Sequence, residues 1–294
     1  PNLTWSPDGR FLALSAKSKG KDDLAIVNYE TGKVTKIRLE QLDAIGSVSW
    51  SPDGSKIAFD ANSGGYQDIY VYDLNTKAFS NVTQDLFTDS DPSWSADSKY
   101  ILFSSNRGQF TRLNTYKKDF VFFTNKDLFQ MDLYRMVIGE ENSERLTNTP
   151  DWEETNPNGL LNGDIIYISD KNGIPNIFQL NPDNKAYKPL TDLQVGVRQL
   201  SVSLDGSRLA VNTYNEGYLD IFLIKSPLLK EREEPLQDSY WALRRKREKE
   251  TQRVPAMGYV FEDYAMVSPL GKTISAEDST QQLDLISLAE KQRI

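Results

Sequence analysis

A tryptophan-led motif recurs at a nearly constant interval and constrains the fold more than any other feature of the sequence. Its three clear copies begin at Trp5, Trp50 and Trp94, so they lie 45 and 44 residues apart. They read WSPDGR, WSPDGS and WSADSK. An interval of about 40 to 45 residues is typical of the blades of a β-propeller. The chain is therefore predicted to consist of copies of one structural unit.

A second motif recurs in phase with the first. Asp23 and Asp68 each open an alternating strand sequence 18 residues after their tryptophan, and Asp220 opens a similar one. Degenerate copies of the first motif lie at residues 161–164 and 204–207, which brings the visible repeats to five. The residues that define the repeat are Trp5, Asp8, Gly9, Asp23, Trp50, Asp53, Gly54, Asp68, Trp94, Asp97, Asp205, Gly206 and Asp220.

Each repeat is predicted to form one four-stranded blade. In the Pro-Asp-Gly sequence, proline presets a turn, aspartate bonds its own backbone and glycine accepts a positive φ, so the sequence closes a hairpin. Two further strands follow before the next copy. The chain is thus predicted to be all-β, a five- to six-bladed β-propeller, with the tryptophans packed between blades. A β-sandwich is disfavoured, because it has no reason to repeat this hairpin in register.

The composition excludes several classes of function. The 294 residues include no histidine and no cysteine, which rules out a Ser-His-Asp triad, an imidazole or thiolate metal site and a thiol nucleophile. The net charge of −8 argues against nucleic acid as a partner. The sequence around Asp89 and Asp91 lacks the spacing of a calcium loop. No apolar run approaches the roughly 20 residues that span a bilayer. We predict no enzymatic activity, cofactor, metal or membrane span.

The third repeat contains an insertion. Asp132 follows Trp94 by 38 residues instead of 18, and the additional residues fall within 107–131, between the second and third strands of the blade. This segment alternates aromatic and basic residues, a composition that protein interfaces favour. An extra hairpin that covers its own blade or a neighbouring blade is an equal alternative. Loops at this position are expected to share a face with the acidic connections between blades. The predicted partner-binding residues are Arg107, Phe110, Arg112, Tyr116, Lys117, Phe120, Phe122, Phe123, Asp89, Asp91, Trp152 and Glu153.

The C-terminal segment differs from the repeats. We predict a propeller over residues 1–225 and an extension over 226–294 that is a linker or an interaction arm. Residues 227–254 are highly charged and predicted to be mostly helical, with strand-like residues at 257–267 and a short helix at 283–288. The cluster of basic residues inside the charged stretch is flanked by glutamates, which indicates a solvated helix face. Part of the extension is an alternative source of the fourth strand that the fifth repeat lacks.

The repeat resembles a known family. The WSPDG hairpin, the DIYVYDL strand and the Gly-Lys turn are similar to those of the TolB-like, WD-repeat-like propellers with Pro-Asp-Gly repeats, over about residues 1–225. Residues 105–108, 146–150 and 169–173 agree with this family as well. The resemblance implies a non-catalytic scaffold that binds protein partners in a bacterial cell envelope, in the periplasm or associated with the outer membrane. The chain starts within a repeat without a signal-peptide pattern, so we expect its natural N-terminus to precede Pro1.

Two other functions are compatible with the same fold. Similar propellers gate access to the active site of peptidases, and such a role would require a hydrolase domain that this chain lacks. A carbohydrate-active propeller, which is less favoured, would require two carboxylates about 5 to 10 Å apart. Whether the ring has five or six blades, and what closes it, is left open by the repeats.

Overall fold

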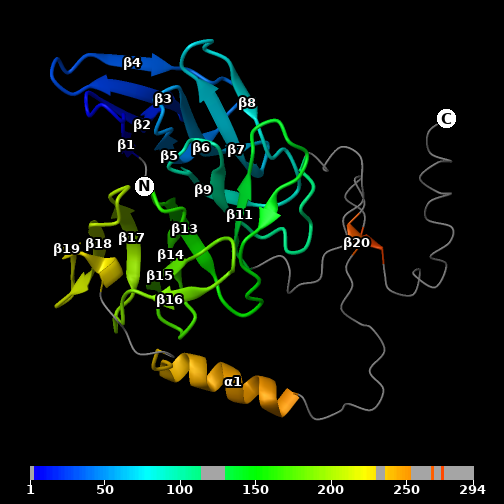
Figure 1. Ribbon diagram of the computed structural model, residues 1–294. Coiled ribbons are helices and arrows are strands. Elements are labelled where there is room, and N and C mark those ends of the chain that lie inside the picture. Colours follow the sequence, from blue (N-terminus) through cyan, green and yellow to red (C-terminus); the bar gives the residue numbers. More distant parts are fainter. Residues whose placement is uncertain (1–2, 114–129, 230–235, 253–265, 268–272, 275–294) are drawn as a thin grey trace.

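The computed structural model describes residues 3–113, 130–229, 236–252, 266–267 and 273–274. Five antiparallel sheets follow one another around a common centre, in the order of the colours from blue to yellow in Figure 1. Each sheet consists of strands that are consecutive in sequence. The prediction of an all-β propeller with four-stranded blades is confirmed, and the number of blades is five.

The blades have the following strands. The first contains β1 (Leu3–Trp5), β2 (Phe11–Ser18), β3 (Lys21–Asn28) and β4 (Val34–Ile37). The second contains β5 (Ala44–Trp50), β6 (Lys56–Ser63), β7 (Tyr66–Asp73) and β8 (Phe79–Asn81). The third contains β9 (Asp89–Trp94), β10 (Ile101–Ser105), β11 (Asp132–Met136) and β12 (Glu144–Arg145). The fourth contains β13 (Glu154–Gly159), β14 (Ile165–Ser169), β15 (Asn176–Leu180) and β16 (Tyr187–Pro189). The fifth contains β17 (Val197–Val202), β18 (Arg208–Asn215) and β19 (Tyr218–Lys225).

The C-terminal extension is partly helical, as predicted. The 3₁₀ turn η1 (Pro227–Leu229) leaves the fifth blade, the helix α1 (Tyr240–Gln252) follows, and β20 (Met266–Val267) pairs with β21 (Thr273–Ile274). Most of the strand predicted at 257–267, and the helix predicted at 283–288, lie outside the described residues. Within the described parts of the chain, no helix is both long and apolar enough to cross a membrane.

The turn between the first two strands has the same hydrogen bonds in four blades. A serine hydroxyl donates to the aspartate two residues later, at 2.6 Å in each case: Ser6 to Asp8, Ser51 to Asp53, Ser95 to Asp97 and Ser203 to Asp205. Each aspartate also accepts a backbone N–H from two residues further on. Gly9, Gly54 and Gly206 have φ between 68° and 76°, a conformation in which glycine avoids a steric penalty. The repeated motif therefore sets the hairpin geometry.

Clusters of buried side chains fill the interfaces between consecutive blades. Phe59 packs between the first and second blades, Phe103 between the second and third, Ile165 between the third and fourth, and Leu209 between the fourth and fifth. None of these clusters of described residues joins the first blade to the fifth. Tryptophan burial follows the same division: Trp94 is 5% exposed between blades, whereas Trp5, on the first blade, is 47% exposed.

A second pattern of hydrogen bonds recurs at the third strands of three blades. Asp68, Asp132 and Asn176 lie at or near the start of the third strands of the second, third and fourth blades. Each accepts the hydroxyl of a threonine 15 residues later, and that hydroxyl in turn accepts the backbone N–H of the residue after the Asp or Asn. In the second blade the threonine is Thr83, which is fully buried. In these three blades a buried polar contact thus links the third strand to the outgoing connection, whereas Asp23 of the first blade pairs with Arg38.

We expect Thr83→Val to lower the free energy of unfolding by about 1 to 3 kcal/mol, because the backbone N–H of Ile69 and the Asp68 carboxylate would each lose a buried partner. Urea denaturation at neutral pH measures the change. Thr35→Val, on the exposed edge strand β4, is the matched control and should be nearly neutral. Equal stability of the two variants would contradict the structural role that we assign to the threonine.

Candidate functional site on the connection face

The loops between second and third strands lie beside the connections between blades. The backbone N–H of Thr88, in one connection, donates to Asn106 Oδ1 at 2.8 Å, and the N–H of Glu153, in the next, donates to Asp170 Oδ1 at 2.7 Å. Asn106 precedes the insertion, and Asp170 lies in the loop from β14 to β15. These bonds agree with the expectation that the two kinds of loop share a face. We call it the connection face.

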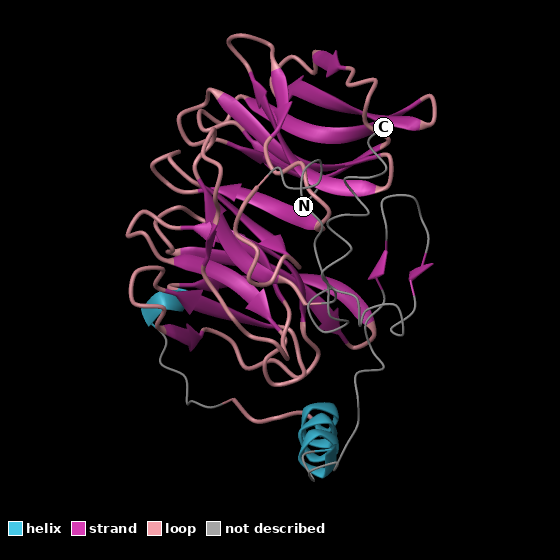
Figure 2. Ribbon diagram, turned by 90° about the vertical axis from the view of Figure 1, so that its right-hand side faces the viewer, coloured by secondary structure: helices cyan, strands magenta, loops and turns pink. Residues whose placement is uncertain are grey.

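Helix α1 docks on this face at the fourth blade. The Asn172 side chain donates to the carbonyl of Gln237 at 3.1 Å, and the N–H of Ser239 donates to the carbonyl of Asn172 at 2.8 Å. Ala242 is fully buried against the loop that contains Gly173. Figure 2 shows α1 at the lower end of the view, beyond the stacked strands. The first residue of the helix, Tyr240, remains 81% exposed.

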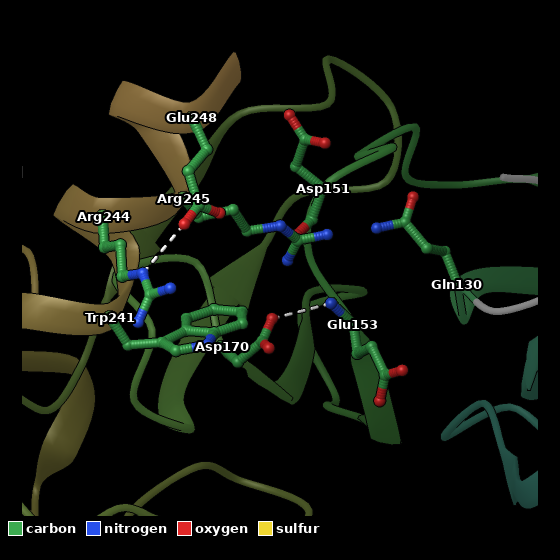
Figure 3. Close-up of a pocket in the computed structure, with 8 residues that line it drawn as sticks. All are labelled: Gln130, Asp151, Glu153, Asp170, Trp241, Arg244, Arg245 and Glu248. Carbon is green, nitrogen blue, oxygen red and sulfur yellow. Dashed lines mark hydrogen bonds and ion pairs between the residues drawn. The ribbon is translucent and has the colours of Figure 1, made fainter. Parts of the chain in front are cut away.

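A pocket of about 720 Å³ lies between α1 and the propeller. It is lined by Gln130, Asp151, Glu153, Asp170, Trp241, Arg244, Arg245 and Glu248 (Figure 3). Gln130 lies near the end of the segment inserted in the third blade, while Asp151 and Glu153 belong to the connection into the fourth. The pocket therefore brings together the three features that the sequence singled out, namely the insertion, the acidic connection and the extension.

Acidic groups outnumber basic groups in the pocket. Four carboxylates and two guanidinium groups line it, which leaves a formal charge of 2 − 4 = −2. Arg244 pairs with Glu248 at 2.8 Å. Arg245 lies 5.1 Å over the Trp241 ring and donates to the carbonyl of Asp151 at 2.9 Å. The wall formed by the propeller is thus acidic, and the Arg245 guanidinium of α1 lies against part of it (Figure 3).

Two carboxyl groups of the wall have raised pKa values. Burial, and to a lesser extent the charge of Asp170, raise the pKa of Glu153, while Arg245 opposes this shift. Burial also raises the pKa of Asp170, and Arg245 again opposes it. A positively charged group placed beside these carboxyls would relieve their repulsion. The arrangement is suited to binding a basic side chain.

Asp89 and Arg107, which the sequence placed in the contact surface, are completely buried. Arg107 Nη2 lies 2.7 Å from both Asp89 oxygens and 3.1 Å from Asp85 Oδ2, and its Nε donates to Ser105 Oγ at 2.9 Å. Asp68, Asp85 and Asp89 each have an oxygen within 4.8 Å of the others, a spacing that would suit a metal ion. The Arg107 guanidinium pairs with Asp85 and Asp89 and offsets part of the negative charge of this cluster. We therefore assign both residues to the scaffold that holds the connection face.

The other predicted contact residues fall into two groups. Phe110 stacks on Phe87 at 5.6 Å, and Arg112 forms a backbone bridge with Asn142, so the start of the insertion runs along its own blade. This favours, for residues 107–113, the alternative that the insertion covers its own blade. Tyr116, Lys117, Phe120, Phe122 and Phe123 lie outside the described residues.

The remaining predicted contact residues are Asp91, Trp152 and Glu153. Asp91 is half-buried and accepts the Ser47 hydroxyl at 3.0 Å. Trp152 is half-buried and Glu153 is exposed, and of the twelve predicted residues Glu153 lines the pocket. Sequence reasoning missed Asp170, Trp241 and Arg245. The one available signal was a tryptophan within a charged helix.

Buried carboxyl groups make stability depend on pH. Burial, reinforced by neighbouring carboxylates, raises the pKa of Asp60 to about 6, of Asp85 to about 7 and of Glu154 to about 8. Because these values exceed those of the unfolded chain, the folded state holds more protons, and stability is lost as pH rises through this range. We expect the free energy of unfolding to be about 1 to 3 kcal/mol higher at pH 5.5 than at pH 8.

Urea denaturation at the two pH values measures this difference. Asp85→Asn should reduce it, because the variant has no proton to lose at that position. A stability that increases from pH 5.5 to pH 8 would contradict the expectation.

Comparisons with known proteins agree with the fold. Residues 3–120 match the model of the TolB β-propeller domain family. TolB from Acinetobacter baumannii is similar at 20% identity and a TM-score of 0.60, over 77% of this chain and 52% of that protein. A putative TolB from Agrobacterium tumefaciens is similar at 20% identity and a TM-score of 0.60, over 76% of each chain. A prolyl endopeptidase is similar at 16% identity and a TM-score of 0.52, over 79% of this chain and 34% of the other. No curated protein matches the sequence.

Proposed function

We propose that this chain, a TolB-like β-propeller, is a non-catalytic scaffold that binds a protein partner through its connection face. We further propose that it acts in a bacterial cell envelope, in the periplasm or associated with the outer membrane. The match to the TolB propeller family and the similarity to two TolB structures support this proposal. The chain spans about half the length of the Acinetobacter protein, so the activity of the whole protein is part of the proposal.

The pocket beside α1 is the observation that carries the proposal. Side chains from the insertion, a connection between blades, the loop from β14 to β15 and the helix α1 converge there. Because packed blades hold most of these positions, little conformational entropy would be lost when a partner binds. Trp241 is 51% exposed and offers an aromatic contact next to the acidic wall, a combination that is common at protein interfaces.

Affinity capture from detergent-solubilised envelopes, quantified by mass spectrometry, tests the proposal. We expect the intact chain to enrich one envelope protein, and Glu153→Lys to reduce its recovery at least about tenfold because the variant reverses a charge in the pocket. Glu30→Lys makes the same change in charge in the turn between β3 and β4. This turn lies at the end of the strands that is opposite to the connection face, so the variant should have no effect. Equal recovery with both variants would exclude the pocket as the binding site.

One comparison favours a second candidate function. The prolyl endopeptidase has a propeller of similar fold, so a propeller that gates a peptidase is the alternative. In that case the captured partner would be a hydrolase, and adding the chain would change the size of the peptides that it cleaves.

A further inference from the structure

We propose that this chain forms a symmetric dimer in which β19, at the outer edge of the fifth blade, pairs in antiparallel orientation with β19 of a second copy. In the first four blades an antiparallel fourth strand covers the third: β4, β8, β12 and β16. In the fifth blade β19 pairs with β18 along all eight residues, and no described strand pairs with its other edge (Figure 1). Such an edge presents unpaired N–H and C=O groups to another strand.

Ile221 shows what this edge lacks. It follows the aspartate of the second repeated motif, as Ile69, Leu133 and Ile177 follow the equivalent residue in the three preceding blades. Those three residues are completely buried, and each donates its N–H to a threonine hydroxyl. Their carbonyls accept a backbone N–H at 2.7 to 2.9 Å from the end of the fourth strand or the residue after it. Ile221 is 81% exposed, and in the described parts of the chain no group takes either role.

The backbone groups of alternate residues in β19 point to the open edge. The N–H of Ser226 donates to the carbonyl of Ser207 at 2.7 Å, so residue 226 faces β18. This orientation alternates along an antiparallel strand, and Leu219, Ile221 and Leu223 therefore direct their N–H and C=O groups outward. A second β19 centred on Ile221 would join Ile221 to its own equivalent and Leu219 to Leu223. All three outward residues would then exchange hydrogen bonds with the other copy.

The side chains of the same residues match under this pairing. Leu219, Ile221 and Leu223 are 52%, 81% and 57% exposed. They share one face of the blade, since they lie opposite Tyr214, Asn212 and Ala210 of β18. In the dimer the aliphatic side chains of the two copies would lie side by side across the new strand pair, an arrangement that stabilises a sheet. The sequence is thus self-complementary about Ile221, as a two-fold interface requires.

The two ends of β19 differ in charge. Lys225 lies at one end, with Arg208 opposite it in β18. The turn at the other end carries Glu216, and Asp220 follows within the strand. Arg198 also lies near the turn end, but it belongs to β17, two strands from the open edge. The formal charge is therefore 1 − 2 = −1 at the turn end and +2 at the other end.

Antiparallel pairing brings the unlike ends together. With Ile221 at the centre, Lys225 of one copy lies opposite Gly217 and next to Glu216 of the other, and the two-fold symmetry forms this contact twice. Glu216 and Lys225 are exposed, and within the described residues neither forms an ion pair, so the contact would replace no existing one. A parallel pair would instead place like ends together. The strand pairing and the aliphatic side chains would supply most of the affinity, whereas the charges would fix the orientation.

Sedimentation velocity of the whole chain, over a range of about 1 to 500 μM, tests the proposal. We expect a reversible dimer that Ile221→Lys weakens at least about tenfold, because two ammonium groups would face each other at the symmetry axis. Leu161→Lys, which changes a residue that is 67% exposed near the turn between β13 and β14, is the matched control and should leave the dissociation constant within about twofold. Both variants change exposed side chains, so both should remain folded.

A charge exchange tests the orientation. Lys225→Glu and Glu216→Lys should each weaken the dimer about three- to tenfold, since each places like charges in contact. The double variant should restore the affinity to within about threefold of the parent, because every copy then carries both exchanged charges. Failure of the double variant to recover would overturn the pairing centred on Ile221.

A cysteine at the symmetry axis provides a second measurement. The chain has no cysteine, so Ile221→Cys introduces a single thiol. Equivalent residues paired across antiparallel strands have Cα atoms about 4.5 to 5.5 Å apart, within the range that a disulfide spans. In the presence of oxidised glutathione, Ile221→Cys should form a disulfide-linked dimer at least about tenfold faster than Leu161→Cys.

Three other results would overturn the proposal. A chain that stays monomeric throughout the concentration range would show that the edge does not accept a second copy. A dimer that Ile221→Lys leaves intact would form through another surface. Slow hydrogen exchange of the Ile221 and Leu223 amides at concentrations where the chain is monomeric would show that another part of the chain covers β19.

Discussion

Arg107→Met is expected to lower the free energy of unfolding by about 3 to 5 kcal/mol, the largest effect on stability that we expect from one substitution. The variant keeps an unbranched side chain of similar length but removes the charge that lies between Asp85 and Asp89. Both aspartates are at most 1% exposed, so water cannot replace the guanidinium. Urea denaturation at pH 7.5, followed by tryptophan fluorescence, measures the loss.

The surroundings of Arg107 explain why no other residue fits this position. Its guanidinium lies 5.3 to 5.7 Å from the ring centroids of Phe87, Phe103 and Tyr134, in addition to its contacts with the two carboxylates. A planar cation can stack on aromatic rings and bridge carboxylates at the same time, whereas a lysine ammonium cannot. We therefore expect Arg107→Lys to recover less than half of the lost stability.

A double substitution separates the charge effect from packing. If the unpaired carboxylates cause the loss, Asp89→Asn should restore part of the stability of Arg107→Met, and the loss should be smaller at pH 5.5, where protonation of Asp85 is favoured. An Arg107→Met variant that is as stable as the parent at pH 7.5 would show that the aspartates do not need a cation. It would then reopen the acidic cluster as a candidate metal site.

The fold could be predicted from the sequence because its determinants are local. Each turn of this type forms its hydrogen bonds within six residues, as between Ser6, Asp8 and Phe11, so similar residues give the same hairpin in four of the blades. The third repeat tolerates the change from glycine to Ser98, which adopts the same left-handed conformation with φ of 59°. A structure that is built from short, repeated interactions can be recognised from its spacing alone.

The site could be predicted only in part, because its contacts join distant residues. Arg107 opens an aromatic and basic insertion, which predicts a contact residue, but its partner Asp89 lies 18 residues earlier, in β9. The basic residues of α1 fit the pattern of a solvated helix, and Arg244 does pair with Glu248. Arg245 differs because its partner is the carbonyl of Asp151, 94 residues away. No local pattern encodes that contact.

The contact between Gly173 and α1 leads to the second large effect that we expect. A Cβ atom at Gly173 would lie 2.2 Å from Ser239 Oγ, 3.0 Å from Ala242 Cβ and 3.2 Å from the Trp241 ring. Gly173→Ala is therefore expected to displace α1 and to remove one wall of the pocket. Trypsin should then cut the basic cluster of the helix at least about tenfold faster, since an undocked helix is accessible. Under the proposed function, recovery of the envelope partner should fall by a similar factor.

The matched control for this substitution is Gly163→Ala. Both glycines have a positive φ, 80° at Gly173 and 88° at Gly163, so alanine introduces similar backbone strain at each. Gly163 has open space where the methyl group would lie, whereas Gly173 faces the helix. Only Gly173→Ala should accelerate cleavage, while both variants should lose about 1 to 2 kcal/mol of stability. If both were cleaved at the parental rate and only Gly173→Ala lost the partner, the loop itself would be the contact and α1 would be dispensable.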